Sequence, residues 1–140
     1  MIDIALAYEI AVRAHKGQVD KAGKAYIMHP MAVAEMVSGR VEKIVALLHD
    51  VPEDTDIDVE SLRVLFGDEI ADALDCLNHR DGEDYMDYIR RVKSNKLATK
   101  IKLADIEHNM DLSRLSEIDD KALKRVDKYK RAKEYLLSAS

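Results

Sequence analysis

Apolar side chains recur along most of this chain at the three- and four-residue spacing of an amphipathic helix. The first such stripe comprises Ile2, Ala5, Leu6 and Ile10, and it precedes Gly17, a residue type that commonly terminates helices. Similar stripes follow at intervals up to the C-terminal end. Together they predict helices over residues 2–14, 30–39, 41–51, 59–66, 69–77, 85–92, 97–112 and 120–137.

Prolines and glycines mark the expected breaks between these helices. Pro30 opens the second helix, because its missing N–H costs nothing there, and we expect it to hold His29 extended just before the helix. Residues 18–28 lack sustained periodicity and are expected to form a loop. No stretch alternates polar and apolar residues long enough for a strand. The sequence therefore predicts an all-α protein, a single compact bundle of about seven or eight helices with one domain over residues 1–140.

Composition narrows the possible functions. The chain has 22 Lys and Arg against 27 Asp and Glu, a formal net charge of -5, which argues against nucleic acid as a partner. Its longest strongly apolar run, residues 44–48, is far too short to span a bilayer, and Asp3 interrupts the N-terminal apolar stretch. We therefore expect a cytoplasmic protein without a membrane partner. The one cysteine, Cys76, excludes an internal disulfide framework, and the oligomeric state stays open.

Four ionisable residues interrupt the end of the most apolar helix. His49 and Asp50 directly follow residues 44–48, and Glu53 and Asp54 come one helical turn later. Buried carboxylates need a cation or several donors, and a divalent metal ion would supply the missing charge. Histidine nitrogen together with carboxylate oxygen in a site open to water suits manganese or iron better than structural zinc.

Further candidate ligands stand elsewhere in the chain. His29 precedes the helix opened by Pro30, and Asp105 interrupts the apolar stripe of residues 97–112. Lys102 and Asn109 flank Asp105 at i-3 and i+4, so they share its helix face. For each aspartate alone, an ion pair with a lysine is the simpler interpretation. Taken jointly, the residues favour a metal site with a substrate beside it.

Several strings in this order resemble a known family. AHKGQVDKAGKAYIMHP, ALLHDVPEDT, LFGDEI and IKLADIEHNMDLSRL are similar to the hydrolase domain of the RelA/SpoT family and its stand-alone small alarmone hydrolases, within the HD-domain metal phosphohydrolases. The resemblance runs from the first helix to Leu115, and its ligand pattern H…HD…D corresponds here to His29, His49 with Asp50, and Asp105.

This resemblance implies a manganese-dependent hydrolase of guanosine 3′,5′-bis(diphosphate) that releases the 3′-pyrophosphate with an activated water. It implies that the four H…HD…D residues hold the metal and that Glu53 and Asp54 serve the attacking water. It places Lys21, Lys102 and Asn109 around the nucleotide, where the two lysines would offset phosphate charge.

The chain departs from that family at two positions. Asp20 and Asp111 stand where synthetase-linked hydrolase domains commonly carry arginine, so a less charged nucleotide is an alternative substrate. Two other functions stay open: an HD-type phosphatase acting on another nucleotide, and a non-catalytic nucleotide-binding module.

Expectations for the surrounding residues are structural. His15 and His108 are expected to make structural hydrogen bonds. The tyrosines that recur at helical spacing are expected to pack, and the basic residues of 120–137 are expected to form a solvated face.

Overall fold

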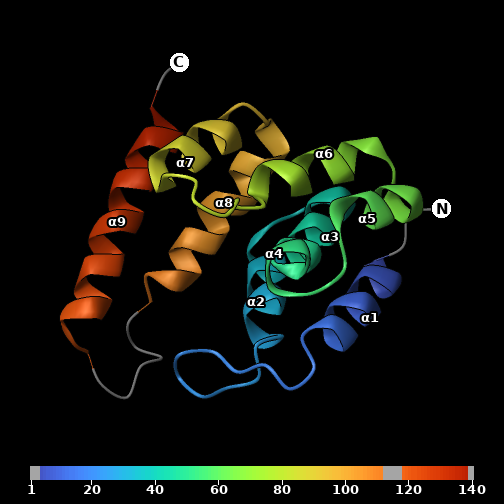
Figure 1. The fold of residues 1–140 in the computed structure, drawn as a ribbon, viewed down its shortest axis with the longest axis horizontal. Coiled ribbons are helices and arrows are strands. Elements are labelled where there is room, and N and C mark those ends of the chain that lie inside the picture. Colours follow the sequence, from blue (N-terminus) through green and yellow to red (C-terminus); the bar gives the residue numbers. More distant parts are fainter. Residues whose placement is uncertain (1–3, 112–117, 139–140) are drawn as a thin grey trace.

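The structure is a computed structural model that describes residues 4–111 and 118–138. Within these ranges it consists of helices α1 Ile4–Ala14, α2 Met28–Met36, α3 Arg40–Leu48, α4 Val51–Asp54, α5 Val59–Phe66, α6 Asp68–Leu77, α7 Tyr85–Lys93, α8 Lys96–Asn109 and α9 Asp120–Leu137 (Figure 1). In the same ranges, β-pairing is limited to one bridge between Val19 and Ala25 in the loop before α2. The prediction of an all-α fold is confirmed.

Local signals explain most helix boundaries. Asp58, Asp84, Asn95 and Asp119 each accept a hydrogen bond from a backbone N–H in the first turn of the helix that follows. Such a cap is worth about 1 kcal/mol. Gly67, at a φ of 92° that favours glycine, separates α5 from α6. Because these signals are local, the predicted bounds of α5 and α9 agree with the structure.

Several predicted boundaries differ from the structure, and α2 ends at Met36, because Val37 is extended, rather than at residue 39. His29 is helical rather than extended, because α2 already begins at Met28 and Pro30 fits within its first turn. The segment 41–51 is not one helix: α3 ends at Leu48, and α4 starts at Val51 with Pro52 in its first turn. The predicted helix start at Ile2 lies outside the described residues. Helix α8 ends at Asn109, before the predicted end at Leu112, which itself lies outside them.

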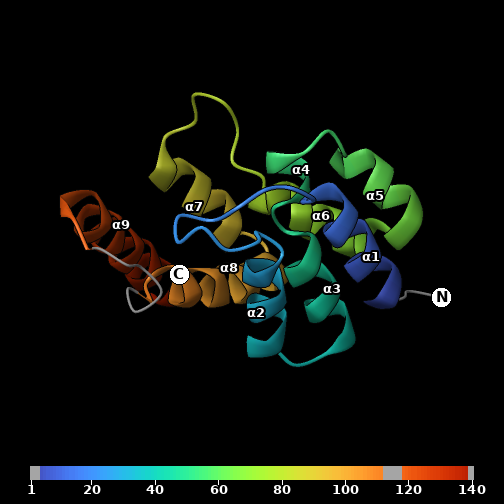
Figure 2. The same cartoon turned by 90° about the horizontal axis from the view of Figure 1, so that it is seen from below.

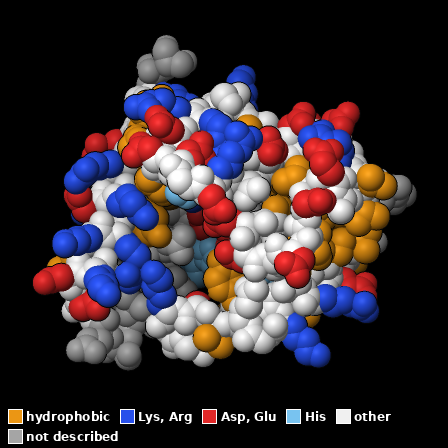
Figure 3. Space-filling model, in the orientation of Figure 1, with side chains coloured by type: hydrophobic (Ala, Val, Ile, Leu, Met, Phe, Trp, Pro, Cys, Tyr) orange, Lys and Arg blue, Asp and Glu red, His pale blue; other side chains and the backbone are white. Residues whose placement is uncertain are grey.

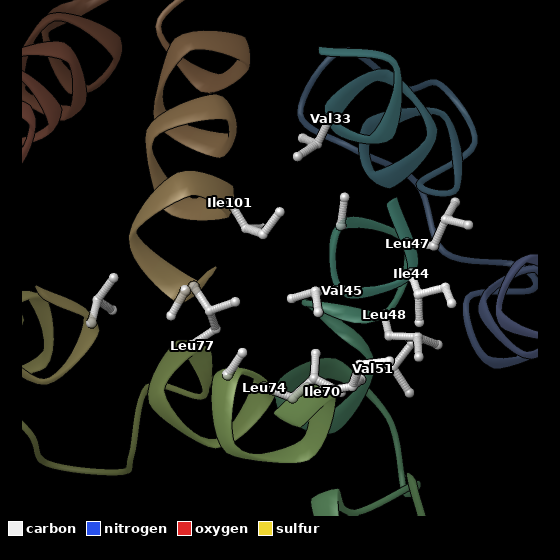
Figure 4. Close-up of a cluster of buried hydrophobic side chains, with 14 of the residues drawn as sticks. Val33, Ile44, Val45, Leu47, Leu48, Val51, Ile70, Leu74, Leu77 and Ile101 are labelled. Atoms are coloured by element: carbon white, nitrogen blue, oxygen red, sulfur yellow. The ribbon is translucent and has the colours of Figure 1, made fainter. Parts of the chain in front are cut away.

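Helix α3 forms the centre of the core. Its residues Ile44 to Leu48 are all buried, and it packs against α1, α2, α6 and α8 (Figure 4). The labelled side chains of α6, including Ile70 and Leu74, point toward α3 from one side. Val33 of α2 and Ile101 of α8 are buried on other sides of α3. Truncating a side chain such as Leu48 to alanine in this core would cost about 2–5 kcal/mol. The C-terminal end of α3 is therefore a rigid platform for His49.

Helix α9 packs mainly on α7 and α8, away from α1 and α2 (Figure 2). Ala132 and Leu136 bury its apolar stripe. Lys93 of α7 caps its C-terminal end by donating hydrogen bonds to the carbonyl oxygens of Tyr135 and Ser138, both at 3.0 Å. In the part of the chain that the structure describes, no helix combines the length and the apolar character needed to cross a membrane.

Candidate metal centre and substrate pocket

Three segments far apart in the sequence meet at the C-terminal end of α3. His29 comes from the first turn of α2, His49 and Asp50 from the break between α3 and α4, and Asp105 from the middle of α8. Both histidines and Asp105 are buried, with 3–5% of their surface exposed. His49 and Asp50 lie at this break with αR backbone angles, and their side chains reach the same point.

The four side chains converge on one small volume. Oδ1 of Asp105 lies 2.7 Å from Nε2 of His29 and 3.3 Å from Nε2 of His49. Oδ2 of Asp50 lies 3.2 Å from Nε2 of His49 and 3.7 Å from Nε2 of His29. Ligand atoms about 2.1 Å from an ion and at right angles to each other lie about 3 Å apart. His29, His49 and Asp105 each offer an atom within 4.8 Å of the other two, and Oδ2 of Asp50 lies beside both imidazoles, so this donor set fits one divalent cation.

Neighbouring groups orient both imidazoles. Nδ1 of His49 donates to the carbonyl oxygen of Ala46 at 2.6 Å, so Nε2 is the ring nitrogen that faces the centre. Nδ1 of His29 lies 2.6 Å from Nδ1 of His108, and the two rings stack with centroids 4.8 Å apart. His108 thus makes the structural hydrogen bond that was expected of it.

Tyr26, in the loop before α2, supports the candidate ligand Asp50. Its hydroxyl donates to Oδ2 of Asp50 at 2.7 Å. Burial and the adjacent Asp50 carboxylate raise the pKa of Tyr26, so the phenol stays protonated as a donor.

The Asp105 carboxylate contacts four other polar side chains of the site. Besides both imidazoles, it accepts hydrogen bonds from Nζ of Lys102 at 2.9 Å and Nδ2 of Asn109 at 3.0 Å. Burial alone would raise the pKa of Asp105, but Lys102 and the two histidines hold it well below its usual value. Burial would likewise lower the pKa of Lys102, which Asp105 instead raises. The two flanking residues therefore hold this carboxylate as well as lining the pocket.

The pKa of His49 reflects the carboxylates that crowd the centre. Burial would lower this pKa, but Asp50 and Asp105 outweigh burial and raise it to about 9. Without a metal ion, the carboxylates are thus partly balanced by a proton on the imidazole. A bound divalent cation would take over that charge, and it would require the neutral ring.

Glu53 and Asp54 extend from α4 beside Asp50. One carboxylate oxygen from each of these three residues lies within 4.8 Å of the others. Partial desolvation, reinforced by the neighbouring carboxylates, raises the pKa values of both Glu53 and Asp54, although both residues keep exposed surface. The backbone N–H of His79 donates to Oε1 of Glu53 at 3.0 Å, which fixes this side chain at the rim.

A pocket of about 610 Å³ opens above the centre, within the size range of small-molecule sites. Figure 3 shows the hollow, with histidine at its floor, acidic side chains along one edge and Lys and Arg on the opposite side. The basic lining residues, apart from Lys102, are Lys21, Arg125 and Lys128. Of the residues predicted to serve the metal, the water or the substrate, two do not line the pocket: His49 and Asp54. The other predicted site residues line it.

Part of the lining departs from the sequence-based expectations. Arg125 and Lys128 of α9 face the pocket rather than belonging wholly to a solvated face, because α9 packs beside α7 and α8. Tyr85 and Tyr129 also line the pocket, and the Lys128 ammonium lies 4.5 Å and 5.2 Å from their ring centroids. The i, i+3, i+4 spacing of these α9 residues shows that they share a helix face, but nothing local shows what that face contacts.

An all-helical bundle that gathers two histidines and two aspartates at one buried point defines a protein of the His/Asp metal-site class. The chain belongs to the HD-domain family, whose pattern matches residues 7–102. The matched segment includes His29, His49 and Asp50 and ends at Lys102, three residues before Asp105.

Curated relatives connect the chain to enzymes of guanosine polyphosphate metabolism. It is 38% identical over 119 residues to the bifunctional (p)ppGpp synthase/hydrolase SpoT of Escherichia coli, covering 74% of this chain and 17% of that protein. It is 34% identical over 143 residues to a GTP pyrophosphokinase of Streptomyces coelicolor, covering 93% of this chain and 16% of that protein. The chain thus spans about one sixth of the length of these relatives.

A solved structure described as "A metazoan ortholog of SpoT hydrolyzes ppGpp and plays a role in starvation responses" has the same fold. The match has a TM-score of 0.77 at 21% sequence identity and covers 97% of this chain and 85% of the other.

Proposed function

We propose that this chain is a manganese-dependent hydrolase that removes the 3′-pyrophosphate of guanosine 3′,5′-bis(diphosphate). The observation that carries the proposal is the convergence of His29, His49, Asp50 and Asp105 at one point beneath a pocket that has basic side chains on its opposite wall. The names of the relatives support the substrate, since several are called (p)ppGpp hydrolases or 3′-pyrophosphohydrolases.

The two imidazole Nε2 atoms and the two aspartate carboxylates would hold the ion. A mixed nitrogen and oxygen set facing an open pocket favours manganese over structural zinc, which prefers a closed tetrahedral site. When bound, the ion would act as a Lewis acid that polarises a phosphoryl oxygen and makes a water molecule more acidic.

The remaining acidic residues would handle the proton of the attacking water. Glu53 or Asp54 would accept this proton as the water oxygen bonds to the 3′-linked phosphorus. The bond from that phosphorus to the ribose oxygen breaks, the ribose oxygen takes up a proton, and pyrophosphate leaves. The backbone N–H of His79 keeps Glu53 at the pocket rim, where it can serve this purpose.

The basic wall would bind the phosphates that do not react. Lys21 belongs to the loop before α2, and Arg125 and Lys128 belong to α9, so the cations approach from two sides of the pocket. They would offset substrate charge that a net-acidic protein otherwise repels. Lys102 and Asn109 would hold Asp105 in place through their hydrogen bonds, and they would also contact the substrate where they line the pocket.

The deciding experiment incubates the purified chain with guanosine 3′,5′-bis(diphosphate) and Mn²⁺ and follows pyrophosphate release. Rapid release that EDTA abolishes and Mn²⁺ restores would support the proposal. Nucleotide and Mn²⁺ binding without turnover of any nucleotide would instead identify a non-catalytic binding module.

A second candidate is phosphohydrolysis of a less charged nucleotide. Asp20 and Asp111 line the pocket, and both add negative charge to it. The same assay with a panel of simple nucleoside phosphates separates the two candidates. Cleavage of such a nucleotide, without cleavage of guanosine 3′,5′-bis(diphosphate), would reverse their order.

A further inference from the structure

The loop before α2 contacts α4 through a pair of side chains that the proposed chemistry does not use. Nε2 of Gln18 donates to the backbone carbonyl oxygen of Asp54 at 3.1 Å. On its other side, Oε1 of Gln18 lies 2.9 Å from Nδ1 of His15. His15 follows the end of α1, so the pair connects α1 to the helix that carries Glu53 and Asp54.

The hydrogen-bond directions in this pair are determined by chemistry. A carbonyl oxygen can only accept, so Gln18 must present its amide NH₂ to Asp54 and its amide oxygen to His15. Nδ1 of His15 then donates to Gln18, and in the neutral tautomer with this proton Nε2 is an acceptor. Nε2 is buried and has no protein partner among the described residues, and His15 is only 2% exposed. Burying an unpaired acceptor is unfavourable, so packing alone does not explain a histidine here.

The same loop also reaches the metal centre. The His15 ring lies 4.9 Å, centroid to centroid, from the ring of Tyr26, whose hydroxyl donates to Asp50. One loop therefore contacts both a candidate metal ligand and the helix with the proton-accepting carboxylates.

Helix α4 needs such external support because of its length. It spans four residues, and the backbone bonds from Asp54 N–H to Asp50 and from Thr55 N–H to Val51 are the helical bonds that define it. A single turn of helix is marginal in water without tertiary contacts. Val51 anchors its start in the core, whereas Asp54 at its end is exposed.

We propose that His15 and Gln18 are positioning residues that set the C-terminal end of α4, and with it the Asp54 carboxylate, relative to the metal ligands. The catalytic part of this inference rests on the proposed function. Tyr26 donates a hydrogen bond to Asp50 and also lies close enough to Asp54 to lower the pKa of that carboxyl. Loss of the Tyr26 hydroxyl should therefore weaken metal binding as well as turnover, whereas loss of the Gln18 amide should affect turnover alone.

Substitutions can separate positioning from stability. Gln18→Met keeps an unbranched side chain of similar length but removes the donor and the acceptor. His15→Leu removes the Nδ1 donor, and His15→Asn restores a donor near that position. Lys16→Met, an exposed change between them, is the matched control. For each variant, kcat, KM, the Kd for Mn²⁺ and Tm are measured.

We expect Gln18→Met and His15→Leu to lower kcat about tenfold, in line with other losses of supporting hydrogen bonds. Their KM and Mn²⁺ Kd should stay within about twofold of the wild-type values. His15→Asn should recover most of kcat, and His15→Leu should not lower Tm, because it removes the unpaired buried nitrogen. Tyr26→Phe should in addition raise the Kd for Mn²⁺ about tenfold.

Amide hydrogen exchange of Asp54 and Thr55 provides a measurement that does not depend on turnover. Gln18→Met should accelerate exchange at these two amides, and Lys16→Met should leave it unchanged. Unchanged exchange in Gln18→Met would overturn the inference, and so would an unchanged kcat or a failure of His15→Asn to recover activity. If the wild-type chain turns over no nucleotide while exchange still responds, the proposed function fails and the positioning of α4 stands.

Discussion

Lys102 and Asp105 form a buried ion pair one helical turn apart on α8, with Nζ 2.9 Å from Oδ2. The other oxygen of the same carboxylate, Oδ1, faces His29 and His49. The lysine therefore compensates the charge of Asp105 from one side, and the metal centre uses the carboxylate from the other. The ion pair with Lys102 explains how the Asp105 carboxylate, which is only 4% exposed, can stay ionised when no metal ion is bound.

Removing this lysine should destabilise the metal-free protein. Lys102→Met leaves Asp105 buried without its cation, and breaking a buried pair in this way costs about 3–5 kcal/mol. Urea unfolding in EDTA measures the loss, and added Mn²⁺ should recover part of it. The control is Lys100→Met, an exposed change on α8. A loss no larger than that of the control would show that the pair contributes little.

Asp50→Asn should abolish metal binding and activity while the fold is retained. We expect the Kd for Mn²⁺ to rise at least about 100-fold, more than for typical losses of supporting groups. In the wild type, Mn²⁺ at 100 times its Kd should stabilise the protein by about 2.7 kcal/mol, visible as a higher Tm. Asp50→Asn should show no such increase, and the neighbouring Asp56→Asn should behave like the wild type. Retained Mn²⁺ stabilisation in Asp50→Asn would remove Asp50 from the ligand set.

The ion pair between Glu83 and Arg91 should make stability sensitive to acid. Arg91 donates to both carboxylate oxygens at 2.7 Å, and its guanidinium lowers the pKa of Glu83 from 4.5 to about 2. Since the folded pKa is depressed, the stabilisation is fully present above pH 4.5 and is lost as the pH falls toward 2. Urea unfolding of the wild type and Glu83→Gln should therefore differ at neutral pH and converge in acid.

Glu134→Gln, an exposed change on α9, serves as the control for that comparison. A difference between the wild type and Glu83→Gln that persists undiminished at about pH 2 would contradict the assigned role of the pair.

Arg125 should contribute to substrate affinity rather than to chemistry. It lines the pocket from α9, far along the chain from the candidate ligands. Loss of one hydrogen bond to a charged group costs about 1.5 kcal/mol, so Arg125→Ala should raise KM about tenfold with little change in kcat. Lys130→Ala, exposed on the same helix and absent from the pocket lining, should change neither. Equal KM values for the two variants would exclude a substrate contact by Arg125.

Local chemistry made much of the fold predictable. The bounds of α5 and α9 follow from an aspartate cap at the start of each helix and from a change of pattern at its end. The sequence could not show that α3 stops at Leu48, because the apolar pattern resumes at Val51 after His49 and Asp50. That these two neighbouring side chains reach one point together with His29 and Asp105 depends on tertiary packing.

By itself, the sequence determined the helical class and supplied residue types suited to a divalent metal: two histidines, two aspartates and two further carboxylates. Only the tertiary structure decided that these side chains meet, that Lys102 is paired with Asp105, and that Gln18 contacts the end of α4. It also turned one face of α9 into a wall of the pocket. The physical reason is range: caps and helical periodicity act within a few residues, whereas the site depends on how buried helices pack.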